Sequence, residues 1–172
     1  MNFKHSNGDN HMPKISKSAV FNAAKISAGC AAAIVISTLL GVKYSATAGL
    51  ITVLSIQNTK KETAEIALKR LISFITAIIT SFISFRFLGY TTTAFAVYLF
   101  VFILICGLFR AQSAIVPVSV LIAHILSEKH FDLQIVINEF LLLFIGAGTG
   151  FLLNLYLHRD TQKMAEYRTA VD

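Results

Sequence analysis

The sequence contains little charge, little proline and little cysteine. Charged residues make up 14% of the 172 residues, hydrophobic residues make up 55%, and the mean hydropathy is +0.68. These proportions leave too few polar groups to coat a water-soluble globule, which excludes a soluble fold. With two prolines and nine glycines, the chain also lacks the composition of a long disordered linker.

The two cysteines, Cys30 and Cys106, both lie inside apolar runs. A free thiol in such a run behaves as a small hydrophobic side chain, so no disulfide framework is predicted. No set of His, Cys, Asp and Glu has the spacing of metal ligands. No nucleophile, base and orienting group recur at a recognisable spacing either, so we expect neither a cofactor nor an enzyme active site.

Long apolar runs punctuated by single charges dominate the sequence. Arg110, for example, interrupts a run from 87 to 127. A helix needs about 20 mostly apolar residues to cross the hydrocarbon, and somewhat fewer when flanking groups reach the interface. We therefore predict an all-α polytopic membrane protein with six transmembrane helices. The predicted spans are 15–42, 45–57, 63–85, 91–109, 111–126 and 135–157.

The basic residues are distributed unevenly between the two sides of this arrangement. Twelve of the fifteen Lys and Arg residues fall on one side and three on the other. Cytoplasmic loops retain positive charge, which predicts a cytoplasmic segment 1–14, a transmembrane domain 15–158 and a cytoplasmic tail 159–172. Topology then accounts for most of the net charge of +6 without a nucleic-acid partner. An anionic-lipid site is the alternative explanation.

The order long, short, long recurs along the spans, with halves at about 15–88 and 91–158. Each half crosses the membrane an odd number of times, so two similar halves would have opposite orientations, as in an inverted repeat. A shift of 68 aligns Ser45 with Ser113, and a shift of 69 aligns Arg70 with Glu139. We therefore expect two inverted three-helix repeats.

The two short segments point to a binding region. Short hydrophobic segments at matching places in two halves indicate a transporter's site, because broken helices expose backbone groups to a cavity. Pro117 frees the carbonyl four residues before it. The alternative is that small and hydroxyl residues only allow close helix packing. The candidate substrate-binding or gating residues of these segments are Ser45, Thr52, Ser113, Pro117 and His124.

Glu139 lies about one helical turn inside the last predicted span. Ionisable groups at such depth are costly enough to indicate a function, which makes Glu139 the proton-coupling candidate. The alternative is that its carboxylate reaches the lipid headgroups. His124 would be either a proton relay or a residue of the outer interface.

The predicted second loop is both polar and basic. Thr59 can cap the helix that follows, with Glu62 completing a capping box, and this cap is the structural explanation of the loop. The functional interpretation is an electropositive cytoplasmic mouth that attracts anions by charge and by the helix dipole. The residues of this mouth are Gln57, Asn58, Lys60, Lys61 and Arg70.

The run from Gly146 to Gly150 is similar to a nucleotide-binding loop only superficially, since its spacing is not G-x-G-x-x-G and no strand precedes it. The two glycines form a G-x-x-x-G face, which allows close helix contact within the chain or between copies.

Several of these stretches resemble the amino-terminal membrane domain of the aromatic acid exporter family, member 1 type, which is related to the fusaric acid resistance transporters. They are AGLITVLSIQNTKKET at 48–63, ALKRL at 67–71, NEFLLLFIG at 138–146 and NLY at 154–156. The resemblance covers about 15–158.

This resemblance implies an inner-membrane protein that exports aromatic carboxylic acids or similar small anions and assembles as an oligomer. Many relatives carry a further cytoplasmic domain after the membrane helices. Two functions remain open: an exporter in which Arg70 and Lys61 attract the anion and Glu139 takes a proton, and a non-transporting scaffold or subunit. In the scaffold, the G-x-x-x-G face and the basic tail would bind a partner protein.

Overall fold

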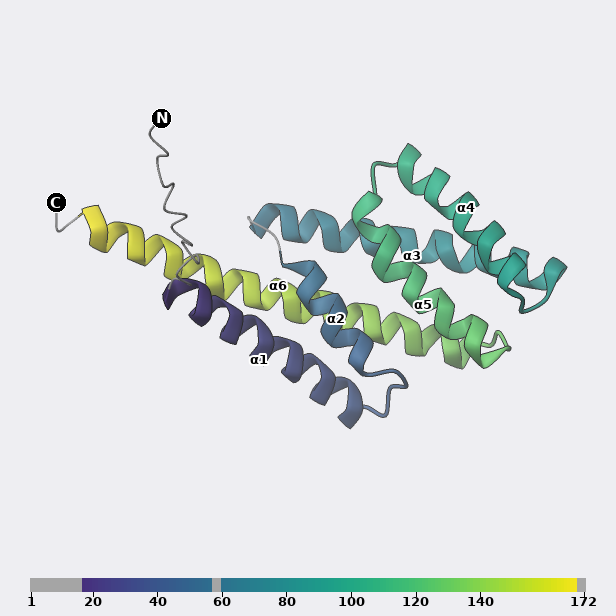
Figure 1. Ribbon diagram of the computed structural model, residues 1–172, viewed down its shortest axis with the longest axis horizontal. Helices are drawn as coiled ribbons and strands as arrows, with labels where there is room; N and C mark the ends of the chain where they lie inside the picture. The colour runs from purple at the N-terminus through teal and green to yellow at the C-terminus, as the bar shows by residue number, and fades with distance from the viewer. Residues whose placement is uncertain (1–16, 57–59, 170–172) are drawn as a thin grey trace, which may run out of the picture.

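A computed structural model describes residues 17–56 and 60–169, and every regular element in this part of the chain is a helix (Figure 1). The all-α prediction is therefore confirmed. The helices are α1 (Lys17–Leu39), α2 (Ala46–Ser55), α3 (Lys60–Leu88), α4 (Thr92–Leu108), the 3-10 helix η1 (Gln112–Ala114), α5 (Ile115–Glu128) and α6 (Leu133–Thr169).

Three of these helices are long and apolar enough to cross a membrane, within Ala19–Leu39, Lys61–Leu88 and Leu133–Leu155. The helices Ala46–Ser55, Thr92–Leu108 and Gln112–Glu128 are apolar but shorter. They fall below the length of about 20 residues that a straight transmembrane helix needs. Length and composition therefore support three of the six predicted spans directly.

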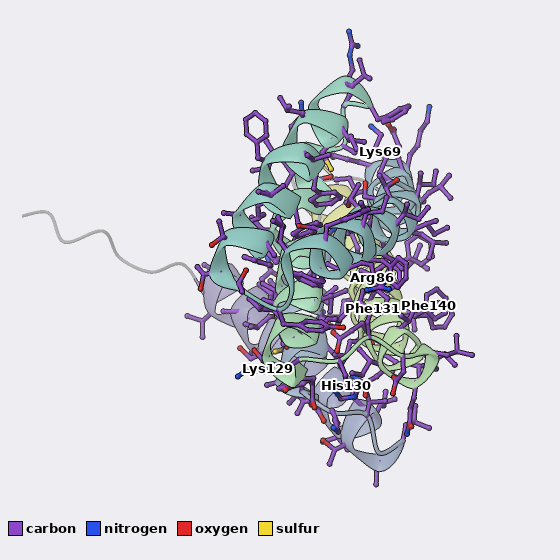
Figure 2. The ribbon with its side chains drawn as sticks, turned by 90° about the vertical axis from the view of Figure 1, so that its right-hand side faces the viewer. Lys69, Arg86, Lys129, His130, Phe131 and Phe140 are labelled. Carbon is purple, nitrogen blue, oxygen red and sulfur yellow. The ribbon has the colours of Figure 1, made fainter. Side chains whose placement is uncertain are left out.

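The helices alternate in direction along the long axis of the molecule (Figure 1). The turns α1–α2, α3–α4 and α5–α6 consequently lie toward one end, and Figure 2 looks onto this end, where Arg86, Lys129 and His130 are labelled. We call it the turn end, and we call the other, at which α1 begins and α6 ends, the terminal end.

The packing of the short helices links the two halves of the chain. Helix α2 packs on α1 and α6, while α5 packs on α3, α4 and α6. Helix α3 also packs on α4 and α6. Each short helix therefore lies against the long third helix of the other half, so the halves interlock rather than stand side by side.

Left-handed residues make the tight turns at the turn end. Gly41, with φ of 68°, follows α1, and Gly89, with φ of 70°, follows α3. Glycine adopts this conformation without the steric cost that a Cβ atom imposes. The left-handed residue ends each helix and allows the chain to reverse its direction.

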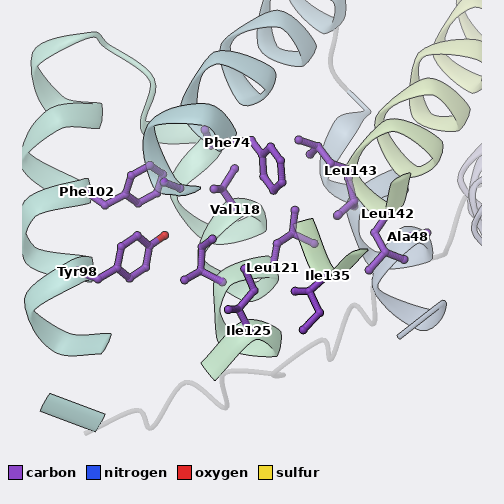
Figure 3. Packing of buried hydrophobic residues seen from close by; sticks show 14 of the residues in the cluster. Ala48, Phe74, Tyr98, Phe102, Val118, Leu121, Ile125, Ile135, Leu142 and Leu143 are labelled. Carbon is purple, nitrogen blue, oxygen red and sulfur yellow. The ribbon is translucent and has the colours of Figure 1, made fainter. Parts of the chain in front are cut away.

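Apolar side chains fill the interior and also cover the outside. Tyr98, Phe102 and Leu121 are fully buried between α4, α5 and their neighbours (Figure 3). On the outer faces, however, Phe100 is 66% exposed and Phe144 is 65% exposed. Soluble proteins rarely leave large contiguous apolar surfaces in water, so this outer surface is suited to lipid.

The boundaries of the last two predicted spans need correction. The segment predicted at 111–126 divides into η1 and α5, and Pro117 lies in the first turn of α5, where a missing N–H breaks no helical hydrogen bond. The last helix does not end at 157 but continues to Thr169, since the polar sequence beyond 157 contains no glycine or proline to stop it.

Candidate functional site

Two buried polar clusters lie at opposite ends of the helices. The Arg70 cluster, toward the terminal end, contains Arg70, the carboxyl end of α2 and the η1 turn. The Glu139 cluster, toward the turn end, contains Glu139, His124 and the α1–α2 turn. Both clusters join groups that are far apart in the sequence, because each forms where a short helix meets a long one.

The Arg70 guanidinium is only 2% exposed and donates three hydrogen bonds to neutral oxygens. Its Nη1 is 2.6 Å from Ser55 Oγ, and its Nη2 is 2.7 Å from the Leu54 carbonyl at the end of α2. Its Nε is 3.3 Å from the Ser113 carbonyl. This carbonyl lies four residues before Pro117, which has no N–H to bond it, so the proline leaves the acceptor open for Arg70.

The buried charge of Arg70 makes no ion pair with any carboxylate in the described residues. Lys69, its neighbour, pairs with Glu65 at 2.8 Å on the exposed side of α3. Burying an unpaired charge is unfavourable even when neutral hydrogen bonds are present. The Arg70 cluster can therefore gain free energy from an anion that replaces one of its neutral acceptors.

The Glu139 carboxyl, which is 1% exposed, is bonded to His124 and Asn138. Its Oε2 lies 2.8 Å from His124 Nδ1, and its Oε1 accepts from Asn138 Nδ2 at 3.1 Å. The second ring nitrogen of His124 is 3.4 Å from Thr47 Oγ1 on α2. Both oxygens of the Glu139 carboxyl and both ring nitrogens of His124 therefore have polar neighbours within the protein.

The α1–α2 turn closes over this pair. Tyr44 stacks on the His124 ring, with ring centroids 4.1 Å apart, and its hydroxyl donates to Glu128 at 3.2 Å. The Lys43 ammonium donates to the same Glu128 oxygen at 3.0 Å. Asn138 accepts from the Lys43 N–H at 2.7 Å. The hydrogen bond that Lys43 donates to Glu128 raises the pKa of Lys43, so this residue is positively charged at neutral pH.

A cavity of about 280 Å³ opens beside this cluster at the turn end. Lys43, Asn138 and Glu139 line it, together with Glu128 and Asp132. The cavity therefore brings water close to a carboxyl group that is otherwise buried, and polar side chains lead from the surface to it.

The two clusters occupy matching positions in the two halves. Arg70 bonds Ser55, which precedes it by 15 residues, and Glu139 bonds His124, which also precedes it by 15. The shift of 69 that aligns Arg70 with Glu139 also aligns Ser55 with His124. In each half, the carboxyl end of the short helix is thus bonded to a buried charged group of the third helix.

The other predicted binding residues have separate locations. Ser45 is half-buried and its hydroxyl donates to the Val42 carbonyl. Thr52 is buried, and its hydroxyl donates to Ala48 and to Gly146 of α6. The Ser113 side chain is exposed and Lys61 is exposed, while Pro117 is buried. Gln57, Asn58 and Thr59 lie outside the described residues, as does the side chain of Lys60.

Gly146 and Gly150 lie directly against α2. A Cβ atom at Gly146 would be 2.6 Å from the Ala48 carbonyl oxygen, and one at Gly150 would be 2.5 Å from Ser55 Cβ. The G-x-x-x-G face therefore holds α2 on α6 within one chain. No partner protein can use these two glycines while α2 covers them.

Sequence reasoning did not identify Tyr44, Asn138 and Glu128 as parts of the Glu139 cluster. Asn138 precedes Glu139 in the chain, but its bonds to the Lys43 backbone cross 95 residues. The bond from Asn154 to Thr63, which ties α6 to α3, was also not foreseen. In the described residues, no group of three or more His, Cys, Asp and Glu could hold a metal ion.

Comparison with known proteins identifies relatives. The family described as "Aromatic acid exporter family member 1" matches residues 19–157. The "Uncharacterized protein YqjA" of Bacillus subtilis (strain 168) is 33% identical over 148 residues, which are 86% of this chain and 46% of that protein. The chain thus spans about half the length of this relative. No solved structure matches the chain.

Proposed function

The chain belongs to the aromatic acid exporter family, and on this premise we propose that it exports small organic anions, including aromatic carboxylic acids, across the cell membrane. The observation that carries the proposal is the buried guanidinium of Arg70, which only neutral oxygens surround in the described structure. A carboxylate is the ligand that a guanidinium binds best, through two parallel hydrogen bonds.

In the proposed topology, the chain crosses the membrane six times as two inverted three-helix repeats, with both termini in the cytoplasm. Support comes from the alternating helix directions and from the equal spacing of the pairs Ser55–Arg70 and His124–Glu139. The short helices pack on longer neighbours, and a bilayer can thin locally around a hydrophobic segment that is shorter than its hydrocarbon region. This orientation places the Arg70 cluster toward the cytoplasm and the Glu139 cluster toward the outside.

Transport in this proposal alternates between the two clusters. Arg70 ties the end of α2 to the η1 turn before α5, and the Glu139 cluster ties the start of α2 to the end of α5. Separating the two short helices at the cytoplasmic end exposes Arg70 to the anion. Separating them at the outer end releases it, as expected for rocking between inverted repeats.

Glu139 is the proposed proton site, with His124 as its partner. The outer cavity supplies the path by which a proton reaches the carboxyl group. A proton that enters Glu139 neutralises its charge and weakens its bond to His124, which loosens the outer contact between α5 and α6. The scaffold function receives no such support, since α2 already covers the glycine face that a partner would need.

Accumulation of labelled aromatic acids in cells with and without the protein tests this function. We expect cells that contain the protein to accumulate less of at least one acid in a broad panel, and Glu139→Gln to restore the accumulation of cells that lack it. The variant retains the size and hydrogen bonds of the side chain but cannot carry the proton.

The matched control is Glu65→Gln, which removes an exposed carboxylate on α3 and is expected to leave efflux unchanged. Insertion of each variant is measured by its recovery from the membrane fraction. Equal accumulation across the panel, with and without the protein, would overturn the export function. Normal efflux by Glu139→Gln would overturn only the proton role.

A further inference from the structure

A groove between α3 and α4 lies apart from both polar clusters. Its volume is about 220 Å³, and its walls include Ile72 and Thr76 on α3, Ile105 on α4 and Phe109 directly after α4. Lys69 lies at one end of the groove, two helical turns before Thr76. The groove is thus apolar along its length and basic at the end that faces the cytoplasm in the proposed orientation.

The surface around the groove faces lipid rather than water. Leu68 and Ile75 of α3 are exposed, as are Leu104 of α4 and Phe109 directly after α4. The Thr76 hydroxyl is already satisfied, because it donates to the Ile72 carbonyl of its own helix at 3.2 Å. The Thr76 hydroxyl is therefore not needed as a hydrogen-bond donor by a ligand, which suits an apolar ligand. The groove is also open to hydrocarbon along its length.

The basic end carries two positive charges. The Lys69 ammonium pairs with Glu65, and its side chain remains 34% exposed. Arg110 is exposed in the α4–η1 turn, between Phe109 and Ala111, which both line the groove. Two cations with one carboxylate leave a net positive charge where a bilayer places its headgroups.

We propose that this groove binds an acyl chain of an anionic phospholipid, whose phosphate lies between Lys69 and Arg110. The apolar walls match the chain and the two basic side chains match the phosphate. The exported anion is the weaker candidate for this place, since the groove faces the lipid on the outside of α3, whereas Arg70 bonds α2 and η1.

The absence of tryptophan from this chain gives a direct test. Phe109→Trp places a single fluorophore in the groove, and Phe100→Trp places one on the lipid-facing surface of α4. Each full-length variant is reconstituted in phosphatidylcholine bilayers that contain phosphatidylglycerol with brominated acyl chains, and quenching is compared with that by brominated phosphatidylcholine.

We expect brominated phosphatidylglycerol to quench the groove reporter selectively, with a preference of about fivefold for each basic side chain. The surface reporter should show no preference. Lys69→Gln and Arg110→Gln should each reduce the preference at the groove reporter. Thr76→Phe, which fills the groove, should abolish it, whereas Ile75→Phe, on the exposed neighbouring position, should not.

Equal quenching by the two lipids at the groove reporter would overturn the proposal. So would equal effects of Thr76→Phe and Ile75→Phe when both variants are recovered folded. Displacement of the brominated lipid by benzoate would assign the groove to a free aromatic anion instead of a lipid. Efflux measured on the same variants separates this result from the export function, which does not depend on the groove.

Discussion

Replacing Arg70 by glutamine is expected to reduce the affinity for the exported anion by about ten- to a hundredfold. The variant loses a charge-assisted hydrogen bond to the anion, a loss of about 1.5–3 kcal/mol. Arg70→Lys retains the charge but loses the planar fork that reaches Ser55, Leu54 and Ser113, so its affinity should lie between those of the native protein and Arg70→Gln. The measurement is the concentration dependence of efflux for labelled aromatic acids.

Arg86→Gln is the matched control, because Arg86 is the exposed arginine at the other end of α3. It should leave the concentration dependence unchanged. If the role of Arg70 is purely structural, both Arg70 variants will yield less folded protein. The efflux by the folded protein that is recovered will then have the same concentration dependence as in the native protein. That result would remove Arg70 from the anion site.

Gly150→Leu is expected to destabilise the fold by about 3 kcal/mol, the upper part of the usual range for overpacking. The new Cβ atom would lie 2.5 Å from Ser55 Cβ and 2.8 Å from the Thr52 carbonyl oxygen, so α2 would have to move away from α6. This movement also displaces Ser55, which holds Arg70. Thermal unfolding of the purified protein in detergent measures the effect.

The neighbouring Gly148→Leu supplies the control on the same helix. Nothing lies within 4 Å of a Cβ atom at Gly148, which is exposed, so the substitution should leave unfolding within experimental error of the native protein. Similar destabilisation by both substitutions would mean that leucine disturbs α6 itself. In that case the contact between α2 and α6 would not be what the glycines provide.

Arg70 and Glu139 can both be identified as candidates from the sequence. Glu139 stands out because charge is rare inside an apolar segment, and Arg70 stands out because it belongs to a basic loop. The repeat follows mainly from the order long, short, long of the segments, and a shift of 69 aligns the two residues. The role of Pro117 also follows from local chemistry alone, since a proline has no N–H to donate to the carbonyl four residues before it. The structure adds that Arg70 is the donor that bonds this carbonyl.

The remaining members of the clusters depend on tertiary packing. Tyr44 meets His124 only because the α1–α2 turn folds over the end of α5, and no local pattern specifies this contact. Asn138 carries no charge and resembles any polar residue near a helix start, although it bonds the Lys43 backbone. Sequence periodicity also does not show that the G-x-x-x-G face meets α2 rather than another copy.

All six helices, the short ones included, cross the bilayer in the proposed topology, and the accessibility of single cysteines tests this most directly. With Cys30 and Cys106 replaced by alanine, a cysteine is introduced at one exposed position at or next to each connection between successive helices and reacted with a membrane-impermeant maleimide in intact and permeabilised cells. The positions are Lys43, Lys61, Thr92, Gln112 and Gln134, which together flank α2, α3, α4 and α5.

We predict that cysteines at Lys43, Thr92 and Gln134 react in intact cells, and that cysteines at Lys61 and Gln112 react only after permeabilisation. Each short helix then separates an outside position from an inside one. Reaction of Lys43→Cys and Lys61→Cys from the same side would show that α2 does not cross, and would contradict the inverted repeat and the alternating access built on it.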